Sequence, residues 1–354
     1  MKIKLAILEK DRIYLERIVS AFNVKFADKL EVYSFTDMDV AIETIIANKL
    51  DVLLVDESFE IDKLTIPPRC AMAYLVSSSD IDSLRNEIAI SKYQKADLIY
   101  KQVLNLYSEN SADITGIHFE ESENTKIITF LSPAGGTGCT TAAAACAVHF
   151  AKSGKRVLFL ELETFDTTDL FFKGDGNGDL SDVIYAIKSK KGNLTLKLES
   201  TVRQDNSGVY FYEPAKTILD MRELNCEEIR RLISQLKLFG NYDYVILTID
   251  FNLDPDTLSI LKDSSKIVLM SDGSHAANKK IEKAVEAVNI LEQQLDYKLI
   301  IKTGILYNRV SSHSSEKVNI PDMKEYGGIN RYEGYPVEQL LKELSSLSVF
   351  DTIA

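Results

Sequence analysis

The chain has 354 residues, with 45% hydrophobic and 27% charged side chains, which suffices for two globular domains and excludes a disordered chain. Its formal net charge is −12 and no region is basic overall, so we expect no nucleic-acid partner. No apolar run reaches the ~18 residues of a membrane span, and the four cysteines have neither metal-ligand nor disulfide spacing. We therefore expect a cytoplasmic protein without direct membrane insertion.

Strand-like and helix-like segments alternate along residues 1–107. Short apolar runs predict strands at residues 2–8, 30–35, 51–56, 72–79 and 96–101. Helical spacing predicts helices at residues 12–22 and 36–49, the second with Thr36 or Asp37 as its N-cap. This alternation predicts a flavodoxin-like doubly wound α/β sheet, whose functional residues lie at the carboxyl ends of the strands.

Charged and hydroxyl side chains stand at four of these strand ends. They are Glu9, Asp11, Asp56, Ser77 and Lys101. The arrangement resembles the receiver domain of response regulators, in which an acidic pair binds Mg²⁺, an Asp accepts phosphate, and a Ser and a Lys contact the phosphoryl group. Here Lys10 takes a slot of the acidic pair, and Gln102 replaces the proline usual after the lysine. We therefore predict a receiver-like domain with a degenerate pocket, used for protein contacts.

An acidic stretch separates the two α/β segments. Residues 108–125 carry five acidic and no basic side chains, which predicts a linker, and residues 126–354 form the second expected domain. Within it, the sequence "FLSPAGGTGCTTAAAA" at residues 130–145 runs from a strand through glycines into strong helix formers. Glycine N–H groups and a helix N-terminus both favour anions, so we expect a phosphate-binding loop here.

This loop resembles the deviant phosphate loop of the MinD/ParA family, K-G-G-x-G-K-T-T. Ala134 and Cys139 stand in the two lysine slots, while the following helix and strand keep the family pattern. The resemblance implies a doubly wound, nucleotide-binding domain with ATP and Mg²⁺ as cofactors. The nucleotide-binding residues that it implies are Ala134, Gly135, Gly136, Thr137, Gly138, Cys139, Thr140 and Thr141 in the loop, with Asn308 near the adenine and the adjoining Arg309.

The acidic positions of the family also differ. Glu161 and Glu163 stand where the family has two aspartates, and Thr248 takes the slot of another, with Asp250 two residues further on. The resemblance implies Mg²⁺ held by Thr140 and Asp250, and Glu163 as a weak catalytic residue. A charge-assisted hydrogen bond is worth roughly 1.5–3 kcal/mol, so losing one lysine weakens ATP binding by about one to two orders of magnitude. Catalysis loses charge neutralisation as well, so we predict weak or negligible hydrolysis.

Residues 335–354 contain an amphipathic helix. Its apolar stripe consists of Val337, Leu340, Leu341 and Leu344. The polar side carries Glu338 and Glu343 against Lys342, whereas a helix that binds a membrane surface has a basic polar side. We therefore predict that this helix packs against the domain core.

A receiver-like domain followed by a MinD/ParA-like domain resembles the TadZ/CpaE proteins of tight-adherence (Flp-type) pilus systems. The resemblance implies a cytoplasmic factor that positions pilus assembly, often at a cell pole. It also implies an ATP-stabilised homodimer whose N-terminal domains recruit pilus assembly or polar-localisation proteins. A phosphorylation-responsive regulator and a nucleotide-free scaffold remain alternatives.

Overall fold

The computed structural model describes residues 2–110, 125–189, 193–239, 241–295, 298–311 and 315–354. The chain divides into two compact units. The first contains the described residues of Met1–Phe119 and Ala186–Thr201, and the second those of Glu120–Tyr185 and Val202–Ala354. Most of the predicted linker at residues 108–125 lies outside the described residues.

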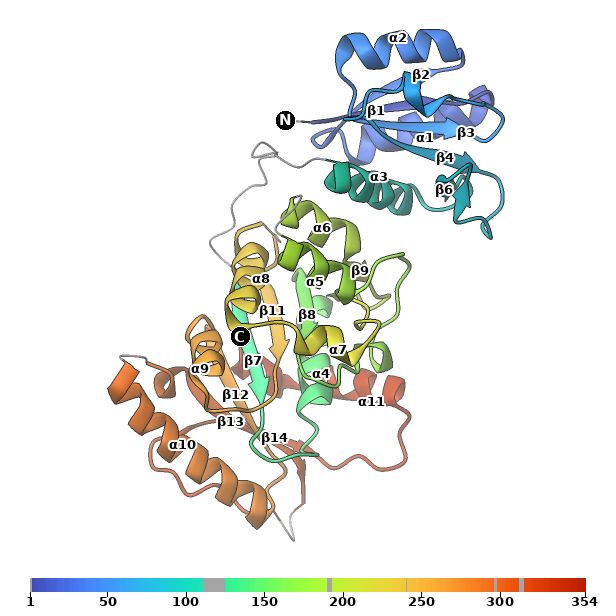
Figure 1. Cartoon of the computed structure of the whole chain (residues 1–354). Helices are drawn as coiled ribbons and strands as arrows, with labels where there is room; N and C mark the ends of the chain where they lie inside the picture. The colour runs from blue at the N-terminus through green and yellow to red at the C-terminus, as the bar shows by residue number, and fades with distance from the viewer. Residues whose placement is uncertain (1, 111–124, 190–192, 240, 296–297, 312–314) are drawn as a thin grey trace. The chain divides into compact units, whose positions relative to one another are not determined.

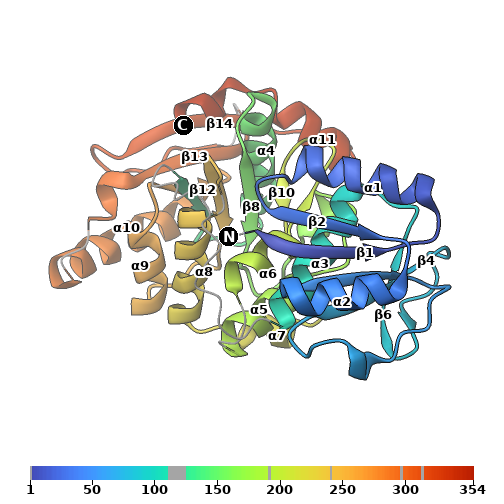
Figure 2. The same ribbon diagram turned by 90° about the horizontal axis from the view of Figure 1, so that it is seen from above.

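The first unit is built around a six-stranded sheet in the order β2-β1-β3-β4-β6-β5 (Figures 1 and 2). The strands that pair in parallel are β1 (Ile3–Leu8), β2 (Leu30–Phe35), β3 (Val52–Asp56), β4 (Ala71–Val76) and β6 (Glu87–Ser91). The short β5 (Ser83–Leu84) pairs antiparallel with β6. Helices α1 (Arg12–Lys25), α2 (Met38–Asn48), α3 (Ala96–Asn110) and α6 (Leu194–Thr201) complete the unit, with the 3₁₀ turn η1 (Lys63–Thr65).

Side-chain alternation in β1 assigns the helices to the two faces of this sheet. Leu5 and Ile7 share a buried cluster with residues of α1 and α3, whereas Ala6 and Leu8 share one with residues of α2. Asp37 accepts hydrogen bonds from two N–H groups at the start of α2, as its predicted N-cap role requires. The doubly wound fold predicted for this part of the chain is confirmed.

The strand predicted at residues 96–101 is wrong, because this segment is the first part of α3. Its apolar residues continue at helical spacing beyond the predicted strand, and Ile99, Val103 and Leu106 are buried on one side. The strand that precedes this helix is β6, whose short sequence "EIAIS" carries a weaker apolar signal.

The second unit has an eight-stranded sheet in the order β14-β13-β12-β7-β11-β8-β10-β9. Its strands are β7 (Lys126–Leu131), β8 (Val157–Glu161), β9 (Arg203–Gln204), β10 (Tyr210–Phe211), β11 (Tyr244–Thr248), β12 (Lys266–Ser271), β13 (Thr303–Val310) and β14 (Lys324–Asn330). Its helices are α4 (Cys139–Lys152), α7 (Ile218–Arg222), α8 (Cys226–Phe239), α9 (Pro255–Lys262), α10 (His275–Leu295) and α11 (Val337–Leu344), with the 3₁₀ turns η2 (Thr168–Leu170), η3 (Ile300–Lys302) and η4 (Ser348–Thr352). Helix α5 (Leu180–Ser189) continues the chain from the second unit into the first.

Parallel pairing brings the ends of the central strands to one edge of this sheet. Strand β7 lies between β12 and β11, and β11 pairs in turn with β8. In this register Glu161 lies opposite Thr248, and Thr248 lies opposite Phe130, directly before the glycine loop. The segments that follow β7, β8 and β11 therefore leave the sheet side by side.

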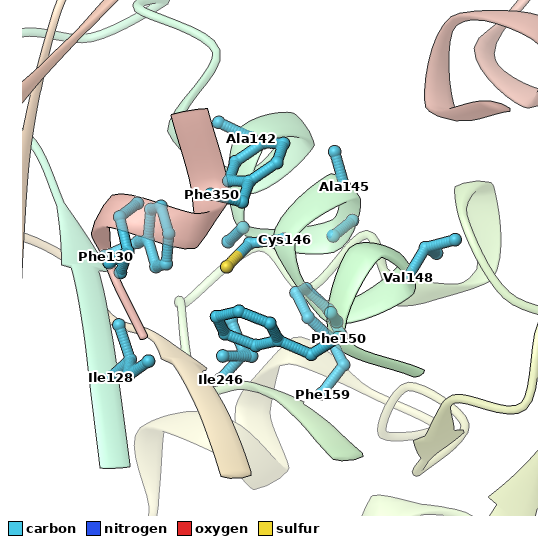
Figure 3. Close-up of a cluster of buried hydrophobic side chains, with 14 of the residues drawn as sticks. Ile128, Phe130, Ala142, Ala145, Cys146, Val148, Phe150, Phe159, Ile246 and Phe350 are labelled. Atoms are coloured by element: carbon cyan, nitrogen blue, oxygen red, sulfur yellow. The ribbon is translucent and has the colours of Figure 1, made fainter. Parts of the chain in front are cut away.

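Helix α4 forms the centre of the second unit's core (Figure 3). Its run of small residues from Ala142 to Ala147 is buried together with Phe130, Phe159 and other side chains of the strands. Small side chains allow a helix to lie close to a sheet, which fixes the position of the α4 N-terminus. Leu341 and Leu344 of α11 and Phe350 of η4 belong to the same cluster, so the predicted packing of the C-terminal helix is confirmed for these residues.

Candidate nucleotide-binding site

The glycine loop connects β7 to α4 at the carboxyl edge of the sheet. Gly136 and Gly138 have φ angles of 74° and 79°, in the left-handed region that glycine adopts without strain. Gly138 is the N-cap of α4, and no side chain caps this helix end. The N–H groups of the first turn are therefore available to an anion, which the helix dipole also favours.

A cavity of about 330 Å³ lies against this loop. Residues from three further segments line it together with the predicted loop residues Ala134, Gly135, Gly136, Thr137, Gly138, Cys139, Thr140 and Thr141. These residues include the predicted Glu163, Asp250 and Arg309, and also Ser132, Ile249 and Phe251, which the sequence motifs did not indicate. Its volume is at the lower end of the range for small-molecule sites.

The two carboxylates that line this cavity each accept a hydrogen bond from a threonine, Thr140 of the cavity lining or Thr164 outside it. Thr140 Oγ1 donates a hydrogen bond to Glu163 Oε1 at 3.1 Å, and Thr164 donates to Asp250 Oδ2 from its N–H and its hydroxyl at 2.8 and 2.7 Å. Burial raises the pKa of Glu163, and the nearby Asp250 adds to this, while the bond from Thr140 opposes it.

The same oxygens are suitable for Mg²⁺ bound together with a polyphosphate. Within the described ranges, no three His, Cys, Asp or Glu side chains form a preformed metal site. Mg²⁺ in nucleotide sites is held by one or two carboxylates or hydroxyls together with the phosphates, so a complete protein cage is not required. Thr140, Glu163 and Asp250 would hold the ion, which would neutralise phosphate charge when bound.

Glu161 is separated from this group by its environment. It is 2% exposed, and Thr167 and Thr168 donate hydrogen bonds to its carboxyl group from their hydroxyls. Burial, followed by the charges of Asp166 and Glu163, raises the pKa of Glu161 to about 8. Without a bound metal, the Glu161 carboxyl group therefore holds its proton more tightly than an ordinary glutamate does.

Asn308 and Arg309 hold the loop from the end of β13. Asn308 Nδ2 donates to Thr137 O at 2.7 Å, and Arg309 Nη1 donates to Gly136 O at 2.8 Å. A Cβ atom on Gly138 would clash with Asn308 Nδ2 unless that amide group moved, and the φ of 79° at Gly138 independently favours glycine. The structure thus places Asn308 against the loop backbone.

An ion-pair network joins the carboxyl ends of β1, β3 and β6 in the first unit. Lys92 is 8% exposed and pairs with Asp56 and with Glu9, whose Oε2 lies 2.7 Å from Lys92 Nζ. Ser58 donates to Asp56 from its N–H and its hydroxyl. Burial alone would raise the pKa of Asp56, but the hydrogen bonds from Lys92 and Ser58 outweigh it and hold the pKa below its usual value.

The other residues predicted for this pocket have different positions. Lys101 lies within α3 and does not end a strand, so the lysine beside Asp56 is Lys92, directly after β6. Asp11 is the N-cap of α1, and Ser77 donates to Glu57 from its N–H and its hydroxyl. The sequence "EIAISK" at residues 87–92 would have indicated Lys92 if its first five residues had been predicted as a strand.

Lys10 adds a second cation close to the loop that follows Asp56. Its Nζ lies 4.6 Å from the centroid of the Phe59 ring and 3.5 Å from Ser58 O. Lys10 thus occupies the region beside the Asp56 loop where the receiver pattern has an acid. The predicted degeneracy of this pocket stays a prediction, because Lys92 beside Asp56 fits the receiver pattern whereas Lys10 departs from it.

Comparisons with known proteins agree with both units. The family described as "TadZ-like, receiver domain" matches residues 1–108, and the family described as "AAA domain" matches residues 125–301. A ParA family ATPase from Chlorobium tepidum superimposes with a TM-score of 0.52 at 18% identity, covering 66% of this chain and 97% of its own. MinD of Aquifex aeolicus, solved in a MinC:MinD complex, superimposes with a TM-score of 0.50 at 16% identity, covering 64% of this chain and 93% of its own.

At these identities the two structures establish the fold alone. None of the curated proteins matches the chain. No helix in the described part of the chain is long and apolar enough to cross a membrane.

The match at residues 125–301 spans half of the chain. The chain therefore belongs to the AAA domain family, and this domain, which has the fold of MinD and ParA proteins, follows a TadZ-like receiver domain.

Proposed function

We propose that the protein is an ATP-binding factor that dimerises with ATP and positions or assembles a tight-adherence (Flp-type) pilus, with weak or negligible hydrolysis. The observation that carries this proposal is the geometry of the glycine loop. The loop keeps its left-handed glycines and the uncapped N-terminus of α4, although Ala134 and Cys139 stand in both lysine slots. A site that retains its phosphate-binding backbone without lysine suits binding better than turnover.

Slow hydrolysis follows from the charges in the cavity. Phosphoryl transfer requires cations that neutralise the charge developing on the β- and γ-phosphates. Two carboxylates, Glu163 and Asp250, line the cavity, and Arg309 is its one Lys or Arg within the described segments. Bound Mg²⁺ would supply part of the missing positive charge, so we expect MgATP to be the bound form.

The receiver domain is proposed as the part that contacts partners. The Aquifex structure contains MinD together with MinC, so a domain with the fold of the second unit, and not of the receiver domain, is known in a complex with another protein. For this chain, we propose that an ATP-bound homodimer presents two receiver domains to pilus assembly or polar-localisation proteins. A cytoplasmic protein recruited to a cell pole through those partners is part of the same proposal.

Light scattering of the full chain, without nucleotide, with MgATP and with MgADP, tests the switch. We expect ATP to convert a monomer into a dimer, since a ligand that binds the dimer preferentially shifts assembly by mass action. Phosphate release in the same samples should be slower than about one per minute, compared with ~1–10² s⁻¹ for efficient phosphoryl-transfer enzymes.

A matched pair of glycine variants tests whether ATP-dependent dimerisation depends on the phosphate loop. Gly136 and Gly154 have φ angles of 74° and 77°, and an added Cβ meets nothing within 4 Å at either position. Gly136→Ala strains the phosphate loop, whereas Gly154→Ala puts equal strain at the other end of α4. Only the first should abolish ATP-dependent dimerisation.

An ATP-independent oligomeric state without nucleotide binding would instead identify a scaffold, and labelling of Asp56 by acetyl phosphate with Mg²⁺ would favour a phosphorylation-responsive regulator.

A further inference from the structure

The cavity beside the glycine loop presents an electrostatic problem for a polyphosphate. Both lysine slots are neutral, and the side chains of Glu163 and Asp250 line the wall. The backbone N–H groups of the loop and of α4 carry only partial positive charge. A full positive charge near the phosphates would therefore strengthen binding considerably.

Arg309 is positioned to supply this charge from outside the loop. It lines the cavity, and its Nη1 donates to Gly136 O at 2.8 Å, so the guanidinium group touches the loop itself. Of its three side-chain nitrogens, only Nη1 has a hydrogen bond within the described segments. A guanidinium has five N–H donors, so several remain for a second acceptor.

The backbone around Arg309 is arranged to hold this position. Arg309 has a φ of 55°, a left-handed conformation that costs free energy in any residue with a Cβ. Its N–H donates to Asn308 Oδ1 at 2.9 Å, and Asn308 in turn donates to Thr137 O. The pairing of β13 with β14 is irregular between Tyr307 and Val310, the segment that contains both residues. Two adjacent side chains thus bond two adjacent loop carbonyls.

We propose that Arg309 takes over the phosphate-neutralising role of the missing loop lysines, with the ATP triphosphate as its ligand. This inference rests on the proposed ATP-binding function. It assigns Arg309 a place at the phosphates, whereas the sequence resemblance implies only that Arg309 binds the nucleotide. Arg309 lies at the end of β13, so its guanidinium group can hold the loop through Gly136 O and also place a positive charge beside the phosphates.

The test compares binding of MgATP and of inorganic tripolyphosphate by calorimetry. Arg309→Met keeps most of the side-chain length without the charge and should weaken binding of both ligands by about 10- to 100-fold. Arg309→Lys should recover most of this loss, since it keeps a cation. Arg230→Met is the control, because Arg230 is an arginine of the same unit that pairs with Asp263 and does not line the cavity.

A second-site variant separates charge from loop support. Adding Cys139→Lys to Arg309→Met returns a cation to the loop without the bond to Gly136, so it should restore binding of both ligands. Failure of this rescue, or loss of ATP binding with tripolyphosphate binding unchanged, would overturn the inference. If the losses occur but ATP never changes the oligomeric state, the proposed switch fails while the role of Arg309 stands. If the parent protein binds neither ligand, both proposals fail.

Discussion

Two glutamates at the end of β8 lie two residues apart in different environments. Glu163 lines the cavity and accepts from Thr140, whereas Glu161 is buried and bonded to two threonine hydroxyls. The pKa of Glu161 is raised from the usual 4.5 to about 8, so the folded state binds its proton more tightly than the unfolded state does. Between these values the folded state holds more protons, and the free energy of unfolding therefore falls as the pH rises.

We predict that Glu161→Gln removes this pH dependence. The glutamine is neutral throughout, so the variant should be more stable than the parent at pH 8 by up to about 4 kcal/mol, and by less than about 1 kcal/mol near pH 5. Denaturant unfolding at a series of pH values measures the difference. Glu227→Gln, at an exposed position in α8, should follow the parent curve. An unchanged slope in Glu161→Gln would show that Glu161 is ionised in the folded protein.

The sequence predicts the residues of the phosphate loop, but it does not predict which distant residues form hydrogen bonds or ion pairs with the sites. The glycines and threonines from Gly135 to Thr141 are consecutive, so a linear motif contains them. The bond between Arg309 and Gly136 joins residues 173 positions apart, and nothing local in either segment indicates it. Lys92 was missed for a related reason, since the ion pair with Asp56 depends on which short apolar run becomes the fifth parallel strand.

At the scale of elements, the burial of each α11 side chain decides how much that side chain contributes to the free energy of unfolding. Leu344 is 3% exposed in the cluster that contains α4, whereas Val337 on the same helix is 39% exposed. We predict that Leu344→Ala lowers the free energy of unfolding by about 2–4 kcal/mol, because the cavity left in the core is not refilled. Val337→Ala should cost less than about 1 kcal/mol. Equal effects in denaturant unfolding would mean that α11 does not pack as described.

The helical period correctly predicted α11 and the burial of Leu341 and Leu344, although Val337 of the predicted stripe is exposed. The same reasoning failed at α3 for a physical reason. A segment of six apolar and polar residues fits a strand or one face of a helix equally well. The remaining turns of α3, through Leu104 and Tyr107, settle the choice, because both are buried on the same side as Ile99 and Tyr100. Short windows therefore misplace the strand, while the longer period identifies the helix.

At the scale of the whole molecule, the first unit is made from two separate pieces of the chain. The chain returns to it at residues 186–201, within the range that matches the AAA domain. Leu196 of α6 belongs to the buried cluster that contains Leu5, Ile7 and residues of α3. Glu199 of the same helix accepts a hydrogen bond from Tyr100 at 3.2 Å. No linear motif or composition change marks this segment as part of the receiver unit.

We predict that Leu196→Ala destabilises the receiver unit although it lies far from residues 1–110 in the sequence. Loss of its buried side chain should cost about 2–4 kcal/mol and increase hydrogen exchange in β1 and β3. Leu258→Ala in α9 removes the same side chain at the same exposure, 1%, from the second unit, and should increase exchange there instead. If Leu196→Ala leaves exchange in β1 and β3 unchanged, α6 contributes nothing to the receiver core. If it increases exchange there, the stability of that core depends on residues encoded within the nucleotide-binding part of the chain.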